Sequence, residues 1–331
     1  MVIEKQSYYG SVDGLRTIAA IGILAMHVSA NNSYAISGFL YDSVIGSFGN
    51  FVFLFMVISA FGMCAGYYDR IINNQISIID FYKKRFVKIL PFFSVLVLID
   101  LLVSPSLNSL YEGFADITLL FGLLPNAGNI SVIGVGWFIG LVFVFYLCFP
   151  FFCCLISTKK RAWISFAISL IYNFACSNYF NVGRSNILYS ACFFLAGGLI
   201  YLYRDDLKAH INKWIMLLVV WLFIAGYYLI SDNVIFCLLV SSLVVIYAII
   251  SWGGVLQNRF TSFISSVSME IYLSHMFIFR IIEKLKLNTV IGNGWIQYLF
   301  TVTIVFIGSV VFSLLMQKTI QKVRYKLIES K

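Results

Sequence analysis

Residues 134–156 read GVGWFIGLVFVFYLCFPFFCCLI, 23 positions without a charged side chain. About 20 mostly apolar residues are enough for a helix to cross the hydrocarbon core of a bilayer. The whole chain of 331 residues has this character: 61% of it is hydrophobic, 11% is charged and the mean hydropathy is +0.92. A soluble domain carries roughly 25% charged residues. The composition therefore excludes an ordinary soluble protein and predicts a membrane protein.

Further apolar stretches of similar length divide the chain. Helices are the expected form, because every backbone polar group in lipid must be satisfied within its own segment or a closed barrel. The run at 117–124 is too short to cross and is predicted to be interfacial or re-entrant. We predict an all-α membrane protein with about ten transmembrane helices, near residues 14–31, 48–68, 86–104, 134–156, 162–178, 187–203, 214–230, 233–252, 262–281 and 294–316.

The positive charges predict the orientation of these spans. Lysine and arginine accumulate in cytoplasmic loops. With both termini in the cytoplasm, 19 of the 23 Lys and Arg residues lie inside, and the outside segments hold Arg184, Arg280, Lys284 and Lys286. The inside set comprises Lys5, Arg16, Arg70, Lys83, Lys84, Arg85, Lys88, Lys159, Lys160, Arg161, Arg204, Lys208, Lys213, Arg259, Lys318, Lys322, Arg324, Lys326 and Lys331.

The chain shows no internal repeat and no second domain. We therefore expect a single integral-membrane domain over residues 1–331, without a fused extracytoplasmic domain. The seven cysteines lie in apolar stretches without the paired spacing of a zinc site, so no metal is expected. The net charge of +9 is assigned to cytoplasmic loops, and no nucleic-acid partner is expected.

Arg16 and His27 are the first candidates for chemistry. Eleven helical residues separate them, a little over three turns and about 16 Å of rise, so both side chains point to nearly the same face. A cation at the cytoplasmic mouth suits a phosphorylated ligand, and a neutral imidazole deeper in the membrane suits proton abstraction. A plain topology anchor at Arg16 and an interhelical hydrogen bond at His27 are the alternatives.

The stretch Lys83-Lys84-Arg85-Phe86-Val87-Lys88-Ile89-Leu90-Pro91 precedes the third predicted span. Arg85 and Lys88 are three residues apart and face one way at a helix start. The positive charges of this stretch are explained equally well as a topology signal or as a binding site for the phosphates of a cytoplasmic ligand.

A polar helix face appears in the ninth predicted span. Ser268, Tyr272 and His275 stand at i, i+4 and i+7, whereas Glu270 is about 140° away from His275. Interhelical packing is the alternative to a chemical role for this face. Trp137 and Tyr146 flank the fourth span, where aromatic residues are common.

These pieces, in this order, resemble the acyltransferase-3 family of membrane acyltransferases. The resemblance runs from about residue 8 to 316. It is carried by Val12-Asp13-Gly14-Leu15-Arg16 followed by His27, by the stretch from Phe55 to Phe61 that contains Ser59, by Arg85-x-x-Lys88-Ile89-x-Pro91, by Trp137 with Tyr146, Leu147 and Pro150, and by Ser268 to His275.

Three departures from the family pattern are visible. Lys88 replaces a second arginine, which keeps the charge but loses bidentate phosphate binding. Ala60 replaces a glycine, a modest packing change. Val142 stands where many members have a glutamate, so that glutamate has no part in this chain's mechanism.

The resemblance implies an enzyme that transfers an acyl group, by default acetyl, from cytoplasmic acyl-CoA to a hydroxyl of a surface glycan or lipid-linked saccharide. The implied location is a bacterial cytoplasmic (inner) membrane, with no permanently bound cofactor. It implies that Arg16, Lys84, Arg85 and Lys88 bind the donor, that His27 is general base or acyl carrier, and that Tyr272 and His275 assist it. Asp13, Ser59, Trp137, Tyr146, Ser268 and Glu270 would support them.

A transporter or flippase of lipid-linked sugars is the competing class. It would also be basic, polytopic and rich in aromatic residues. Such a protein should distribute polar groups along several spans around a central path. Here the intramembrane ionisable groups concentrate in the first and ninth spans, which favours the enzyme.

Overall fold

The computed structural model describes residues 9–124, 133–251 and 254–329. Within these ranges the regular structure is helical, without strands. Lys5 and Lys331, which contribute to the predicted charge asymmetry, lie outside them. The helices are α1 (Gly10–Ala30), α2 (Phe51–Met63), α3 (Asp69–Ile72), α4 (Ile78–Val103), α5 (Leu107–Thr118), α6 (Trp137–Leu155), α7 (Lys159–Asn178), α8 (Ile187–Leu202), α9 (Arg204–His210), α10 (Lys213–Leu229), α11 (Val234–Ile250), α12 (Arg259–Ser266), α13 (Ser268–Lys284) and α14 (Trp295–Glu329).

Short helical turns connect several of these helices: η1 (Leu40–Ile45), η2 (Phe48–Asn50), η3 (Cys64–Tyr68), η4 (Leu120–Leu123), η6 (Gly254–Leu256) and η7 (Leu287–Thr289). Capping residues in the sequence mark the starts of several longer helices. Ser77, Thr158 and Asn258 accept hydrogen bonds from the backbone N–H three residues later and begin α4, α7 and α12. Each satisfies a donor that a helix start would otherwise leave unpaired.

Five helical segments of the described chain are long and apolar enough to cross a membrane: Gly10–Ala30, Leu40–Ile72, Ile78–Val103, Trp137–Leu155 and Trp295–Tyr325. The number rises to seven if each of two bent pairs is one span. The chain is thus an all-helical protein with several apolar spans. Each of the ten predicted segments overlaps a helix, but a count of ten spans, like the orientation, stays a prediction.

One predicted span is interrupted, and another is followed by a sharp bend. The segment at 262–281 is divided at Val267, where α12 ends and α13 begins. The segment at 187–203 continues into α9 through a bend of 62°. The short run at 117–124 is likewise broken, because α5 ends at Thr118 and Leu119 adopts a left-handed conformation with φ of 59°.

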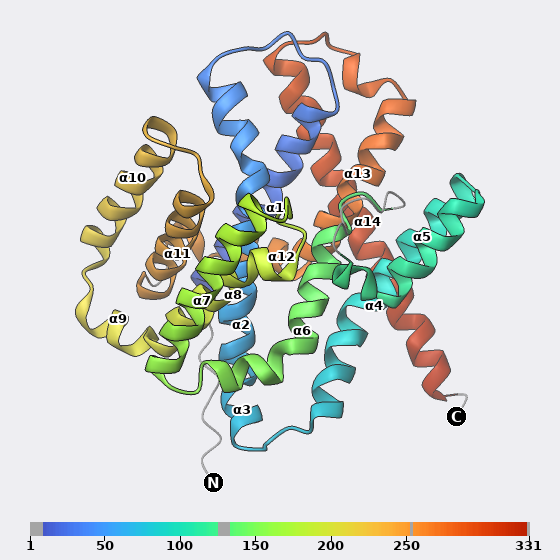
Figure 1. The fold of residues 1–331 in the computed structure, drawn as a ribbon. Coiled ribbons are helices and arrows are strands. Elements are labelled where there is room, and N and C mark those ends of the chain that lie inside the picture. The colour runs from blue at the N-terminus through green and yellow to red at the C-terminus, as the bar shows by residue number, and fades with distance from the viewer. Residues whose placement is uncertain (1–8, 125–132, 252–253, 330–331) are drawn as a thin grey trace.

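Helix α1 lies at the centre and packs against α2, α11, α12, α13 and α14, while α10 and α5 flank the bundle on opposite sides (Figure 1). Aromatic stacking joins the neighbouring helices. The rings of Phe53 and Phe193 stack at 4.3 Å, and those of Phe145 and Phe194 stack at 4.2 Å. Because α1 is surrounded, a polar side chain on it faces other helices.

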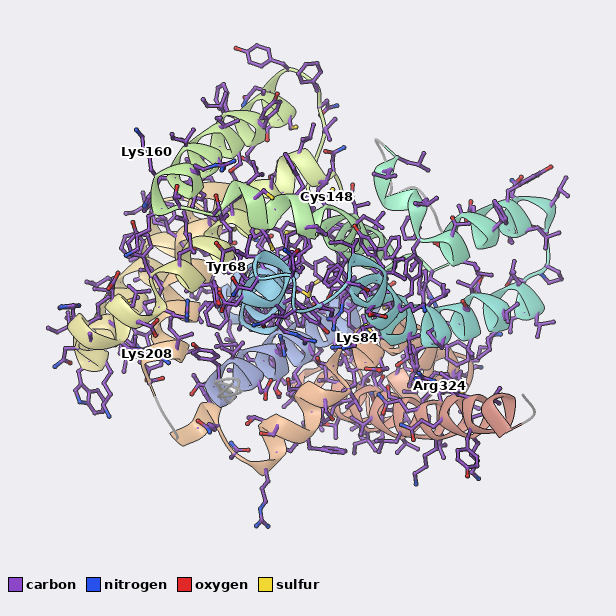
Figure 2. All side chains as sticks on the ribbon, turned by 90° about the horizontal axis from the view of Figure 1, so that it is seen from below. Tyr68, Lys84, Cys148, Lys160, Lys208 and Arg324 are labelled. Atoms are coloured by element: carbon purple, nitrogen blue, oxygen red, sulfur yellow. The ribbon has the colours of Figure 1, made fainter. Side chains whose placement is uncertain are left out.

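Basic side chains surround one end of the bundle. Figure 2 looks from the end at which α4 begins and α14 ends, and Lys84, Lys160, Lys208 and Arg324 are spread around it. At this end the Lys159 ammonium lies 2.6 Å from the Asp206 carboxylate and lowers the pKa of that carboxyl. This ion pair links α7 to α9.

Candidate functional site

A cavity of about 390 Å³ lies between α1, α2, α4, α6 and α13. Its wall combines cations, hydroxyl groups and aromatic rings. Eight of the predicted site residues contribute to it, although they come from five separate parts of the sequence: Arg16, Ser59, Arg85, Lys88, Tyr146, Ser268, Glu270 and Tyr272.

Arg85 is held between two aromatic rings. Its guanidinium carbon lies 4.5 Å from the centroid of the Tyr67 ring and 5.7 Å from that of Tyr146. It also donates a hydrogen bond to the Tyr67 hydroxyl. Its Nε is buried without a hydrogen-bond partner among the described residues. The protein therefore fixes the Arg85 side chain, while its Nε–H stays available to donate a hydrogen bond to a ligand.

Tyr67 and Arg70 were not predicted as site residues. Both line the cavity, and the Arg70 guanidinium lies 5.4 Å from the Tyr67 ring centroid. Arg70 was interpreted only as a topology charge, which sequence cannot distinguish from a ligand-binding one. The signal available was the tyrosine pair directly before Asp69-Arg70, at the end of an apolar run.

Arg16 is positioned by its own helix and by α12. It forms an ion pair with Asp13 at 3.4 Å, and the Asp13 carboxylate accepts a hydrogen bond from Ser265 at 2.8 Å. Gly62 provides the space beside it, because a Cβ at Gly62 would lie 2.9 Å from Arg16 Nη2. Asp13 thus orients the cation without lining the cavity itself.

Lys88 and Glu270 extend the charged part of the wall. Lys88 lies within electrostatic range of Arg16, Arg85 and Glu270. Glu270 accepts a hydrogen bond of 2.7 Å from Gln317 on α14. Ser268 donates to the Ser265 carbonyl at 2.9 Å, which connects α13 to α12 across the break between them.

Three aromatic side chains that line the cavity contact one another, and we call them the aromatic barrier: Phe55, Phe138 and Tyr272. The Tyr272 ring centroid is 6.3 Å from that of Phe55 and 5.5 Å from that of Phe138, both in edge-on contact. The Tyr272 hydroxyl donates to the Val135 carbonyl at 3.0 Å, which fixes the ring.

Beyond Tyr272 lies a pair of histidines. The ring centroids of His27 and His275 are 5.1 Å apart, and that of Tyr272 is 6.0 Å from His275. His275 is 1% exposed, its Nδ1 is 3.3 Å from the Ile271 carbonyl oxygen, and its Nε2 is buried without a partner in the described chain. His27 is half-buried.

The helical spacing predicted one common face for Arg16 and His27. Arg16 lines the cavity, whereas His27 and His275 are not among the residues that line it. The histidines are reached from the cavity through Tyr272, the member of the aromatic barrier that contacts His275. Trp137 lies at the start of α6, with its ring 5.9 Å from that of Phe138 and 5.4 Å from the guanidinium of Arg184.

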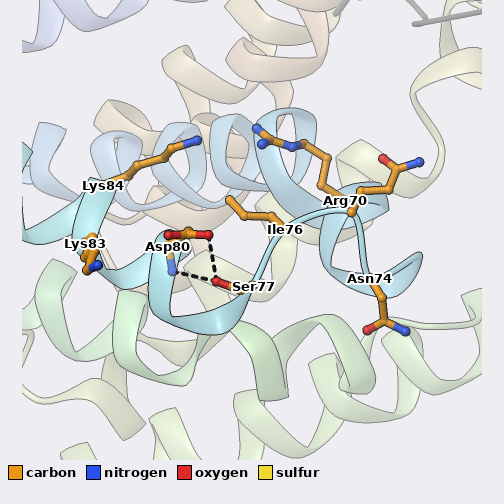
Figure 3. Close-up of a pocket in the computed structure, with 8 residues that line it drawn as sticks. Arg70, Asn74, Ile76, Ser77, Asp80, Lys83 and Lys84 are labelled. Carbon is orange, nitrogen blue, oxygen red and sulfur yellow. Dashed lines mark hydrogen bonds between the residues drawn. The ribbon is translucent and has the colours of Figure 1, made fainter.

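Lys84 belongs to a second, more open cavity of about 380 Å³. It shares Arg70 with the first cavity. Figure 3 shows the Lys84 and Arg70 side chains extending toward each other from α4 and α3, while Asn74 points away. Ser77 caps α4 there and bonds the Asp80 carboxylate at 2.8 Å. Two adjoining cavities thus share a row of cations.

Cations in the wall of a cavity, with two imidazoles next to its Tyr272, are chemically suited to group transfer from an anionic donor. A family model described as an acyltransferase domain, that of the acyltransferase-3 family, matches residues 9–316. The chain belongs to this family and is an acyltransferase. No curated protein and no solved structure matches it significantly.

Proposed function

We propose that this protein moves an acetyl group from cytoplasmic acetyl-CoA to a hydroxyl of a surface glycan, such as O-antigen, capsule or exopolysaccharide, in a bacterial inner membrane. One observation carries the proposal: the cavity with Arg16, Arg85 and Lys88 in its wall reaches Tyr272, next to the His27–His275 pair. The donor is a co-substrate, and no bound cofactor takes part.

The donor enters from the basic end. Lys84 and Arg70 pair with the phosphates of the nucleotide in the open cavity, and Arg85 offers its free Nε to the next phosphate. The uncharged arm of the donor then occupies the first cavity, between Ser59 and Val142 on its two sides. The thioester is presented at the aromatic barrier.

His27 acts as the general base. It removes the proton of the acceptor hydroxyl while the hydroxyl oxygen attacks the thioester carbonyl carbon. The new C–O bond forms, the C–S bond breaks, and the proton passes from His27 to the departing sulfur. His275, in ring contact with His27, orients that imidazole, and the Tyr272 hydroxyl lies close enough to support the developing oxyanion if it leaves Val135.

Both termini lie in the cytoplasm in this proposal. The basic end in Figure 2 then faces the compartment in which acetyl-CoA is made. His27, eleven residues further along α1 than Arg16, lies toward the far face, where the acceptor arrives.

The test compares surface polysaccharide from a deletion strain that carries wild-type protein, His27→Ala or His210→Ala. His210 is the matched control, because it lies on α9 and bonds only the Asp206 carbonyl among described groups. We expect one acetyl mass per repeat to return with wild type and His210→Ala, and not with His27→Ala at equal membrane level.

Full acetylation by His27→Ala would overturn the mechanism. Loss of whole repeat units in the deletion strain, rather than of acetyl groups, would point instead to transport of lipid-linked sugars.

A further inference from the structure

Arg184 is a second fixed arginine, and it lies outside the cavity that the donor cations line. It belongs to the connection between α7 and α8. Its Nη1 donates to the Gly49 carbonyl at 3.1 Å, and its guanidinium carbon lies 5.4 Å from the Trp137 ring centroid. Ser190 donates to the Arg184 carbonyl at 2.9 Å and fixes the backbone. Two distant segments of the chain thus contact the side chain, and Ser190 fixes the backbone that carries it.

Arg184 lies close to the reaction centre. The Gly49 carbonyl that accepts its hydrogen bond lies beside α1, because a Cβ at Gly49 would be 3.2 Å from Cε of Met26, the residue before His27. Neither Arg184 nor Trp137 lines the donor cavity, although the next residue, Phe138, is part of the aromatic barrier. The arginine and the tryptophan therefore lie outside the donor cavity, with the tryptophan on the part of α6 that precedes the aromatic barrier.

The charge of Arg184 is not neutralised by the protein. Within residues 9–124, 133–251 and 254–329, no carboxylate forms an ion pair with it. A guanidinium has five N–H donors, and the described chain gives this one a single acceptor, the Gly49 carbonyl. The side chain is exposed. By contrast, Arg280 pairs with Glu283 at 2.8 Å.

A fixed, unpaired guanidinium beside an aromatic ring is suited to a planar or tetrahedral anion attached to a sugar. The fork of N–H donors matches carboxylate and phosphate oxygens, and an indole ring offers a flat apolar surface to a sugar face. A role limited to anchoring the loop would be served equally well by a neutral donor to Gly49.

We propose that Arg184 and Trp137 form the acceptor-binding site, and that the acceptor is an anionic glycan whose carboxylate or phosphate pairs with Arg184. The assignment rests on the proposed function. Binding of the anion at Arg184 places a neighbouring hydroxyl of the sugar at His27. Arg184 thereby determines specificity, whereas the donor is bound elsewhere.

The test uses the full-length protein in lipid nanodiscs with acetyl-CoA and three probes: methyl glucuronide, glucose 1-phosphate and the neutral methyl glucoside. The release of CoA is measured over a range of probe concentrations. We expect a charged probe to change the rate of CoA release, either because it accepts the acetyl group or because it inhibits. The effective concentration of that probe should be about 10- to 100-fold lower than that of methyl glucoside, which is the range for one charge-assisted hydrogen bond. A preference for glucuronide indicates a sugar acid, and one for glucose 1-phosphate indicates a phosphorylated acceptor.

Arg184→Gln should abolish this difference between charged and neutral probes, and Arg184→Lys should retain part of it. Arg280→Gln is the matched control, since it removes another arginine from a predicted outer segment, and it should keep the full difference.

Equal responses to charged and neutral probes in the wild type, including no response to any, would overturn the proposal. So would an undiminished preference in Arg184→Gln. Failure of the proposed function would look different, because CoA release would then not exceed that of empty nanodiscs, with or without a probe.

Discussion

The imidazole rings of His27 and His275 lie 5.1 Å apart, although one ends the first long helix of the chain and the other lies in α13. His275 is fully enclosed, while His27 is half-buried. In the proposed mechanism the half-buried His27 meets the substrate. The enclosed member can act only through His27.

Replacement of His275 tests this division of roles. We expect His275→Gln to lower kcat by about 100-fold, a usual scale for disturbing a general base, with little change in the KM for acetyl-CoA. The reason is that the donor path does not include His275. Steady-state kinetics of CoA release check that kcat falls while KM is unchanged. Thermal unfolding in nanodiscs controls for folding. A large rise in the KM for acetyl-CoA with unchanged kcat would contradict it.

A second prediction concerns the space beside Arg16. A Cβ at Gly62 would lie 2.9 Å from Arg16 Nη2, so Gly62→Ala should displace the guanidinium from the cavity. We expect the KM for acetyl-CoA to rise about tenfold, the scale of one hydrogen bond to a charged group. Isothermal titration with CoA would check the affinity directly.

Gly46→Ala is the control for this experiment, since nothing lies within 4 Å of a Cβ there. It should leave the KM unchanged. An equal effect of both substitutions would show that helix propensity, and not Arg16, is responsible.

A third prediction concerns Arg85. Arg85→Ala removes a cation that Tyr67 and Tyr146 hold in the cavity wall. We expect acetyl-CoA to bind about 10- to 100-fold more weakly, while the affinity for acceptor changes little. The salt dependence of donor binding should also become shallower, because exposed charge interactions are screened.

Arg161→Ala, which removes a surface cation that bonds Ser157 at 3.1 Å, should leave donor binding unaltered. Equal weakening of donor and acceptor in Arg85→Ala would indicate a general folding defect instead.

The sequence predicted the residue types of the site better than their arrangement. Arg16, Arg85 and Lys88 stand out because charge is rare in so apolar a chain, and the cavity brings them together. The approach of His27 to His275 depends on how two helices distant in the sequence pack. No helical periodicity within one span contains that information.

Arg70 and Arg184 were missed for a different physical reason. A cation near the end of a span is equally explained by topology, and only its surroundings distinguish a binding residue. Tyr67 beside Arg70, and Trp137 beside Arg184, provide those surroundings in three dimensions. The break at Val267 was also missed, because it lies within the predicted span 262–281.

The contacts among Phe55, Phe138 and Tyr272 have a consequence for the cell as well as for the reaction. A water-filled passage from the basic end to the histidines, and from there to Arg184, would conduct protons and dissipate the gradient on which the cell's energy supply depends. Apolar constrictions exclude water and ions. In the proposed mechanism the acyl group passes these three rings, and the same contacts keep ions from crossing between turnovers.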